Sequence, residues 1–180
     1  MHTLWGKAEL LNDGKTAAGT PVHVQFLGNN PHMLAANAVR AVELGAPAID
    51  MNFGCPAKTV NRHRGGSVLL DEPEVVHELV KAVRDAVPSH IPVSAKMRLG
   101  YMDRNFTLEN AHAIEDAGAA WVTVHARTKA DGYTPPAFWD QLQPIREALK
   151  INVIANGEIW NNADAKQCVI ESGCQDIMIG

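Results

Sequence analysis

The sequence predicts an α/β fold of the (β/α)8 TIM-barrel type, with about six of the eight strand–helix units in this chain. Short apolar runs alternate with helical patterns, which is typical of parallel sheets built from βαβ units. Each apolar run ends in polar residues or glycine, as barrel strands do at the end where active sites lie. The length of 180 residues corresponds to about one domain.

The predicted strands and helices alternate along the chain. The first helix has Asn30 as its N-cap, Pro31 at its first position and Gly45 beyond its end, and another helix begins at Thr107 and stops at Gly118. We expect strands at 22–27, 48–53, 92–99, 121–127, 151–156 and 176–179, and helices at 31–44, 73–87, 107–117, 140–149 and 162–172.

The polar strand ends favour a barrel over an open, doubly wound sheet. Side chains alternate across a strand, so Lys96 and Arg98 share one face, as do His125 and Arg127. An open sheet would gather its ligand groups at one switch point, whereas here five or six strands offer them. A complete barrel takes ~250 residues. We therefore expect residues 1–180 to be a partial barrel domain, without two N-terminal units and whatever follows.

Composition excludes several classes of protein. Hydrophobic residues make up 46% and charged residues 20%, an ordinary globular balance. A net charge of -4 argues against a surface coated in basic residues but allows a local basic patch. Three cysteines without CxxC spacing argue against a disulfide framework and a metal site, and favour the reducing cytoplasm. No apolar run approaches ~18 residues, so we expect no membrane span.

Cys55 is the first candidate catalytic residue. It follows a predicted strand, between Gly54 and Pro56, at the place where barrel chemistry occurs. A cysteine can also be a small buried hydrophobe, and that alternative stays open here. For Cys168 and Cys174, which lie in or beside the last helix, it is the preferred interpretation.

The loop after Cys55 carries Lys58, Arg62 and Arg64, with no acidic residue before Asp71. Loops between a strand and a helix usually take about 2–6 residues, and longer ones are often binding loops. The charges predict contact with phosphate groups, although a solvated surface is the alternative.

Later strand ends supply further candidates. Lys96 and Arg98 should meet an anion or polar ligand, or else form a structural ion pair with Glu158. His125 ends a strand without any HxH or HExxH metal spacing, so a structural role stays open. Backbone N–H groups around Gly157 and Gly180 fit the phosphate site that barrels often build after their last strands.

Taken together, these stretches resemble the dihydrouridine synthases, a family of flavin-dependent enzymes that modify tRNA. The NxGCP motif with the following K-x-V and Gly-Gly is highly specific, and the NGEIW stretch is similar to the bacterial C-type subgroup. The matching stretches occur in the family's order from Val22 to Gly180, as VQFLG, DMNFGCPAKTVNRHRGGSVLL, VSAKMRLG, VTVHARTK, VIANGEIW and DIMIG.

The resemblance implies reduction of the C5–C6 double bond of a uridine in the tRNA D-loop, uridine-16 in the C-type subgroup. NADPH would reduce FMN, whose N5 would pass a hydride to C6. Cys55 would then protonate C5 as general acid, with Asn52 and Arg98 at the uracil. Uracil C5 becomes basic only as hydride reaches C6, so a positioned proton donor is needed. Residues that match FMN-holding positions are Gln25, Lys96, His125, Asn156, Gly157, Glu158 and Gly180.

The chain also departs from the family pattern. The first strand with its Ala-Pro-Met-like turn, the helical C-terminal domain and the arginine after Gly180 have no match here. Two other functions stay open, a flavin-dependent reductase of small pyrimidines on the same barrel and a non-catalytic fragment. The basic loop favours a tRNA enzyme, because a small substrate needs no loop that contacts phosphates.

Overall fold

The computed structural model describes residues 14–179. Its strands form one parallel sheet whose order in space, β1-β2-β3-β4-β5-β6, is their order in the sequence. The strands are β1 (Val24–Phe26), β2 (Ile49–Phe53), β3 (Val93–Arg98), β4 (Trp121–His125), β5 (Asn152–Asn156) and β6 (Asp176–Met178). A doubly wound sheet reverses its order at a switch point, and this one does not, so the barrel-type prediction is confirmed.

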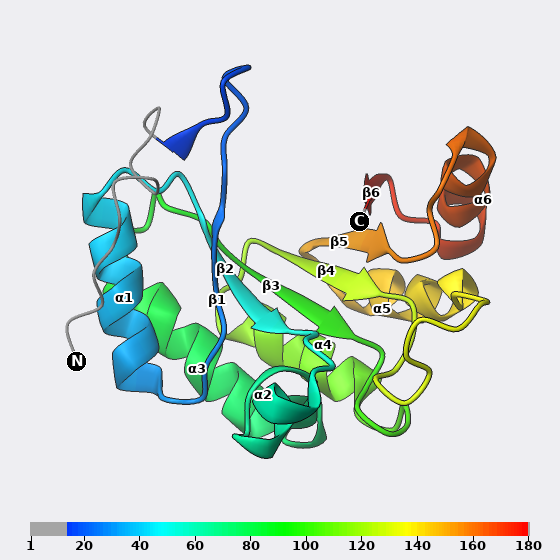
Figure 1. The fold of residues 1–180 in the computed structure, drawn as a ribbon, viewed down its shortest axis with the longest axis horizontal. Helices are drawn as coiled ribbons and strands as arrows, with labels where there is room; N and C mark the ends of the chain where they lie inside the picture. The colour runs from blue at the N-terminus through cyan, green and yellow to red at the C-terminus, as the bar shows by residue number, and fades with distance from the viewer. Residues whose placement is uncertain (1–13, 180) are drawn as a thin grey trace.

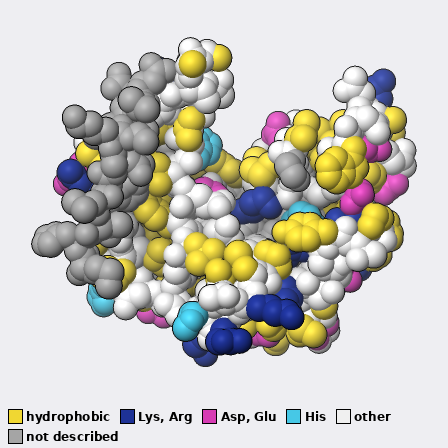
Figure 2. Space-filling model, viewed as in Figure 1, with side chains coloured by type: hydrophobic (Ala, Val, Ile, Leu, Met, Phe, Trp, Pro, Cys, Tyr) yellow, Lys and Arg dark blue, Asp and Glu magenta, His cyan; other side chains and the backbone are white. Residues whose placement is uncertain are grey.

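The sheet is curved, and helices cover its convex side (Figure 1). Neighbouring helices contact one another in sequence order around this side. They are α1 (Pro31–Glu43), α3 (Pro73–Ala86), α4 (Thr107–Asp116), α5 (Leu142–Ala148) and α6 (Asn162–Ser172). Within the described residues β1 and β6 do not pair, so the sheet remains open. The space-filling view shows a deep notch between them (Figure 2).

The alternation of side chains in each strand decides which residues enter the core. In β2, Ile49, Met51 and Phe53 are buried against the helices, while Asp50 and Asn52 point to the concave side and are only half-buried. Burying one such apolar side chain contributes about 1.5–3 kcal/mol. The core therefore lies between sheet and helices, and the polar residues of the strands are left to line the concave side.

Helix boundaries agree with the sequence signals. The Asn30 side chain accepts a hydrogen bond from the Met33 amide at 3.0 Å, as expected of an N-cap. At the end of α6, Gly173 takes a left-handed conformation with φ of 66°.

The long loop after Cys55 is more ordered than the sequence predicted. It contains the short helix α2 (Lys58–Arg62) and the 3-10 helix η2 (Gly66–Asp71), and a further 3-10 turn, η3 (Trp139–Gln141), precedes α5. No helix among the described residues is long and apolar enough to cross a membrane.

Candidate active site

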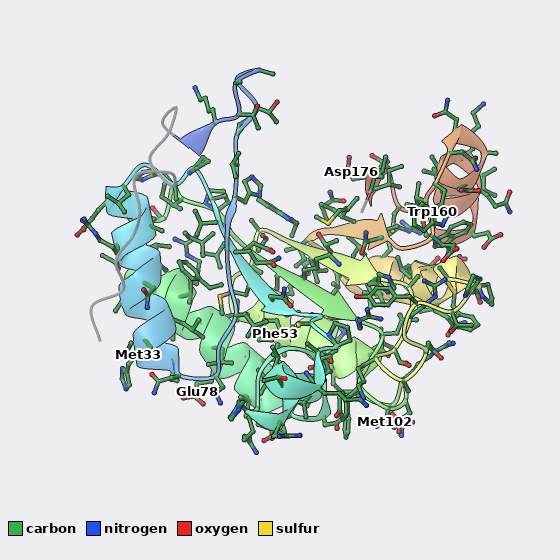
Figure 3. All side chains as sticks on the ribbon, viewed as in Figure 1. Met33, Phe53, Glu78, Met102, Trp160 and Asp176 are labelled. Atoms are coloured by element: carbon green, nitrogen blue, oxygen red, sulfur yellow. The ribbon has the colours of Figure 1, made fainter. Side chains whose placement is uncertain are left out.

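A cleft of about 730 Å³ opens at the carboxyl ends of the strands. Figure 3 shows Phe53 at the tip of β2 and Trp160 beyond β5, on either side of these strand ends. The cleft brings together eight side chains expected from the sequence: Gln25, Asn52, Cys55, Lys96, Arg98, His125, Asn156 and Glu158. Its volume is in the range of small-molecule and cofactor sites.

Cys55 is a free cysteine, half-buried at this cleft, on a loop held from several sides. The Asn52 side chain accepts from the backbone N–H groups of Gly54 at 3.0 Å and Cys55 at 2.9 Å. The carbonyl oxygen of Cys55 accepts from the Asn61 side chain at 3.0 Å and the Ser67 hydroxyl at 2.9 Å. The thiol is therefore presented by a fixed backbone.

The second glycine of the Gly-Gly pair, Gly66, stands where a side chain would not fit. Gly66 has φ of 66°, and a Cβ at this position would lie 2.7 Å from the carbonyl oxygen of Cys55. Any side chain there would push the Cys55 loop out of place. Cys55 and Gly66, eleven positions apart in the motif, are thus parts of one compact turn.

Lys96 is a half-buried cation on the floor of the cleft. Its Nζ donates to Asn156 Oδ1 at 2.7 Å, and Asn156 Nδ2 donates to the Met178 carbonyl at 2.9 Å. Burial, and then the nearby charge of Arg98, lower the pKa of Lys96 from 10.5 to about 8. An ammonium has three N–H donors, so Lys96 keeps donors for a ligand.

Arg98 braces the loops around Cys55. Its Nε donates to the Gly54 carbonyl at 2.9 Å, and Nη1 donates to the carbonyls of Thr128 and Gly132, each at 3.0 Å. The guanidinium also lies 5.1 Å from the centre of the Tyr133 ring. Arg98 thereby joins the Cys55 loop to the loop that follows β4.

The alternative ion pair of Lys96 or Arg98 with Glu158 is not formed. Glu158 pairs instead with Arg127, which is 2% exposed, and its other oxygen accepts from Trp160 Nε1 at 3.0 Å. These hydrogen bonds, first that of Arg127, hold the pKa of Glu158 below its ordinary value. Glu158 thus orients Trp160, whose side chain stands at the edge of the cleft.

His125 is buried at the end of β4, and its Nδ1 has no hydrogen-bond partner among the described residues. Burial, and then the charges of Arg98 and Lys96, lower the pKa of His125 to about 3, so the ring is neutral at pH 7. Next to it, Gly157 has φ of 108°, and a Cβ there would lie 3.0 Å from His125 Nε2. An orphaned buried nitrogen beside the spare donors of Lys96 suits a polar ligand rich in acceptors.

The predicted basic residues lie outside the cleft, on the turn that includes α2. Lys58 and Arg62 are exposed, and Figure 2 shows Lys and Arg side chains gathered on this part of the surface. Arg64 differs from them because its side chain forms an ion pair with Glu72 at 2.8 Å. The charge of Arg64 is therefore partly neutralised, while contact of this turn with phosphate groups stays a prediction.

Apart from Gly54 and Pro56, which flank Cys55, four cleft residues were not among the sequence candidates: Arg127, Tyr133, Trp160 and Met178. Arg127 could have been found from its position two residues after His125, at a polar strand end. No local pattern pointed to Tyr133, which is 69% exposed and reaches the cleft from the loop after β4. Gly180 lies outside the described residues. Among residues 14–179, no group of His, Cys, Asp and Glu is placed to hold a metal ion.

Comparison with known proteins identifies relatives over almost the whole chain. The family model described as dihydrouridine synthase (Dus) matches residues 3–180. A tRNA-dihydrouridine(16) synthase of Shewanella oneidensis is 56% identical over 96% of this chain and 55% of that protein. Another of Neisseria meningitidis serogroup A is 51% identical over 99% of this chain and 56% of that protein. The chain thus spans about half the length of these curated relatives.

Solved structures with a similar fold are more distant. D-glucarate dehydratase from Agrobacterium tumefaciens superposes with a TM-score of 0.66 at 13% identity, over 88% of this chain and 39% of that one. A putative lyase/mutase from Burkholderia cenocepacia gives a TM-score of 0.65 at 19% identity, over 97% of this chain and 61% of that one. At such identities the likeness shows a shared fold alone.

Proposed function

This chain belongs to the dihydrouridine synthase family, and we propose that the protein reduces the C5–C6 double bond of a uridine in the tRNA D-loop. The relatives are named for position 16, so uridine-16 is the target we propose. Residues 1–180 would supply the barrel part of the catalytic domain, and the enzyme would work in the cytoplasm. The observation that carries the proposal is the free thiol of Cys55, held at a cleft that also contains the spare donors of Lys96.

FMN is the cofactor we propose, with NADPH as reductant. When bound, FMN supplies the hydride that goes to C6 of the uracil. The residues of the cleft fit an acceptor-rich ring, because Lys96 retains N–H donors and His125 Nδ1 is buried without a partner among the described residues. Its proposed contacts are Gln25, Lys96, His125, Asn156, Gly157, Glu158 and Gly180. Of these, Asn156 and Glu158 also fix their neighbours, Lys96 and Trp160.

Cys55 is the proposed proton donor to C5. Asn52 uses its Oδ1 to hold the Cys55 loop and one N–H to reach Gln25, which leaves its second N–H for a uracil oxygen. Arg98 lies beside them, donates to the Gly54 carbonyl of the Cys55 loop and packs against the Tyr133 ring. The uracil is thereby oriented with C5 towards the thiol, and a positioned acid of this kind accelerates a reaction by about 10²–10⁴-fold.

The tRNA backbone is the proposed partner of the exposed turn around α2. A target base must leave its stack to enter a barrel mouth, and the displaced strand then needs support. Lys58 and Arg62 are exposed there and form no ion pair within residues 14–179, and Arg64 supplies less charge because of its ion pair with Glu72. This turn favours tRNA over a small pyrimidine, which the cleft alone could hold.

The test is a comparison of variants of the full-length protein on tRNA that lacks dihydrouridine. Cys55→Ala should abolish dihydrouridine formation, measured by mass spectrometry of nucleosides, while flavin absorbance is retained. Cys168→Ala is the matched control, because this buried cysteine lies on α6 away from the cleft, and it should leave the activity intact.

Three results would contradict the proposal. Normal turnover by Cys55→Ala would remove Cys55 from the acid role. A protein that stays colourless after FMN is added would exclude a flavoenzyme and favour a non-catalytic role. Reduction of free uracil at the rate seen with tRNA would favour a reductase of small pyrimidines.

A further inference from the structure

A carboxylate on the concave side of the sheet, Asp50 of β2, has no part in the chemistry proposed above. It is half-buried, and both of its oxygens accept hydrogen bonds from neutral groups. Ser94 Oγ donates to Oδ1 at 2.6 Å, and Gln25 Nε2 donates to Oδ2 at 2.6 Å. Bonds to an ionised acceptor are short and about twice as strong as neutral ones. Asp50 is therefore a strong acceptor with both of its oxygens engaged.

The register of the sheet places these three side chains in one row. Gln25 of β1 is opposite Asp50 of β2, and Asp50 is opposite Ser94 of β3. Ser94 is fully buried, so the row is anchored on its β3 side. Gln25 stands at the other side, on the first strand of the described sheet, where its side chain is exposed.

A directed chain of hydrogen bonds leads from Asp50 to Cys55. An ionised carboxylate only accepts, so Gln25 turns its NH2 group to Asp50 and its Oε1 towards Asn52. Asn52 Nδ2 donates to Gln25 Oε1 at 2.8 Å, which leaves Asn52 Oδ1 for the backbone N–H groups of Gly54 and Cys55. Each link of this path joins a donor to an acceptor, and the carboxylate sets the direction from one end.

Gln25 needs such an anchor because it is exposed. A free glutamine side chain samples several rotamers, and holding it in one of them costs conformational entropy. The charge-assisted bond to Asp50 offsets that cost and keeps Oε1 in place for Asn52. Without the bond to Asp50, Gln25 would no longer hold the Asn52 side chain, and the Cys55 loop would be held less firmly.

We propose that Asp50 is a positioning residue for Cys55, acting through Gln25 and Asn52. The proposal rests on the role of Cys55 as proton donor given above. It assigns to Asp50 neither contact with the substrate nor transfer of a proton. Its effect is to keep the thiol at one position relative to the bound uracil, and loss of position is costly to a reaction that depends on geometry.

Two variants of the full-length, flavin-loaded protein test the chain of hydrogen bonds. Gln25→Glu places two carboxylates at hydrogen-bond distance, so they repel and the side chain at position 25 leaves Asn52. The double variant Gln25→Glu/Asp50→Asn has the same total charge as the native pair. It restores the chain, because the amide at position 50 donates to the carboxylate at position 25, which also accepts from Asn52.

The measurement is hydrogen exchange of the Gly54 and Cys55 amides by NMR at neutral pH. Gln25→Glu should accelerate their exchange about threefold to tenfold, the effect of losing one ordinary hydrogen bond. The double variant should return exchange to the native rate. Because Gln25 is also a proposed FMN contact, kcat for dihydrouridine formation is compared at saturating FMN between Gln25→Glu and the double variant, which share glutamate at position 25, and it should be higher in the double variant. Asp176→Asn is the control, because this exposed β6 carboxylate accepts from Asn152 and takes no part in the path from Asp50 to Cys55, and it should change neither value.

Unchanged exchange in Gln25→Glu, or no recovery in the double variant, would overturn the proposal. So would accelerated exchange with native kcat, because the loop would then move without consequence for the reaction. If Gln25→Glu does not fold, Gln25→Met removes the same contacts without a charge and should accelerate exchange likewise. Exchange is measured without tRNA, so it tests the hydrogen bonds even if the native protein proves unable to reduce uridine.

Discussion

Replacement of Lys96 by methionine should stabilise the flavin-free protein at pH 7. Lys96 is a half-buried cation whose pKa is lowered from 10.5 to about 8, chiefly by burial. The folded state therefore binds this proton less tightly than the unfolded state does. A shift of this size corresponds to about 3 kcal/mol of destabilisation wherever both states carry the proton, which includes pH 7.

Methionine keeps most of the volume and removes the charge. It also removes the bond from Lys96 Nζ to Asn156 Oδ1, which costs about 1 kcal/mol. The expected net gain for Lys96→Met at pH 7 is thus about 2 kcal/mol in the free energy of unfolding. FMN binding should weaken in the same variant, because the cleft loses a cationic donor.

The dependence on pH gives the sharper test. Between about pH 8 and 10.4 the unfolded state holds the Lys96 proton that the folded state has lost, so the stability of the native protein rises with pH. Lys96→Met lacks this contribution, and its advantage should shrink through the same window. Urea denaturation at several pH values measures both curves, and other titrating groups cancel in the difference. A variant that is less stable at pH 7, with the same pH slope as the native protein, would refute the reasoning.

Three further predictions concern the basic turn and the neighbours of Lys96. Arg62→Ala should weaken tRNA binding and lower the slope of log affinity against log salt by roughly one. Arg64→Ala should lower the slope less, because Arg64 is ion-paired with Glu72. Equal slopes in the native protein and both variants would exclude phosphate contact. Left-handed strain costs an alanine about 1–2 kcal/mol. Gly157→Ala should lower the free energy of unfolding by more than this, because the new Cβ also contacts His125. Gly19→Ala is the control in the same denaturation assay, because Gly19 has φ of 84° and open space around it and should show the strain alone. The ring signals of His125 should not titrate in NMR spectra between about pH 5 and 8, because its pKa is about 3; a midpoint near 6.5 would contradict its burial.

The elements were largely predictable because their signals are local. Apolar periodicity, the Asn30 cap and the terminal glycines depend on residues a few positions apart, and the structure confirms all six strands and five helices expected. The exceptions, α2 and η2, are short and lack strong periodicity. Their order comes from contacts such as those of Asn61 and Ser67 with the Cys55 carbonyl.

The partners of the charged residues were not predictable in the same way. Glu158 was weighed as a partner of Lys96 or Arg98, but it pairs with Arg127. Arg64 was counted as a free charge, but it pairs with Glu72. Each choice depends on which side chains a strand or turn brings within about 3 Å, a distance that spacing in the sequence does not specify.

The sequence by itself determined the alternation of strands and helices and the motif that contains Asn52 and Cys55. It did so because backbone preferences and the periods of apolar residues act over short stretches of chain. Only the tertiary structure decided that Asp50, Gln25 and Ser94 form one row, that Arg98 binds three carbonyl groups, and that Lys96 is a half-buried cation. Those features arise from strand register and burial, which join residues far apart in the chain. Burial then shifts the proton affinity of a side chain away from the value that its residue type sets.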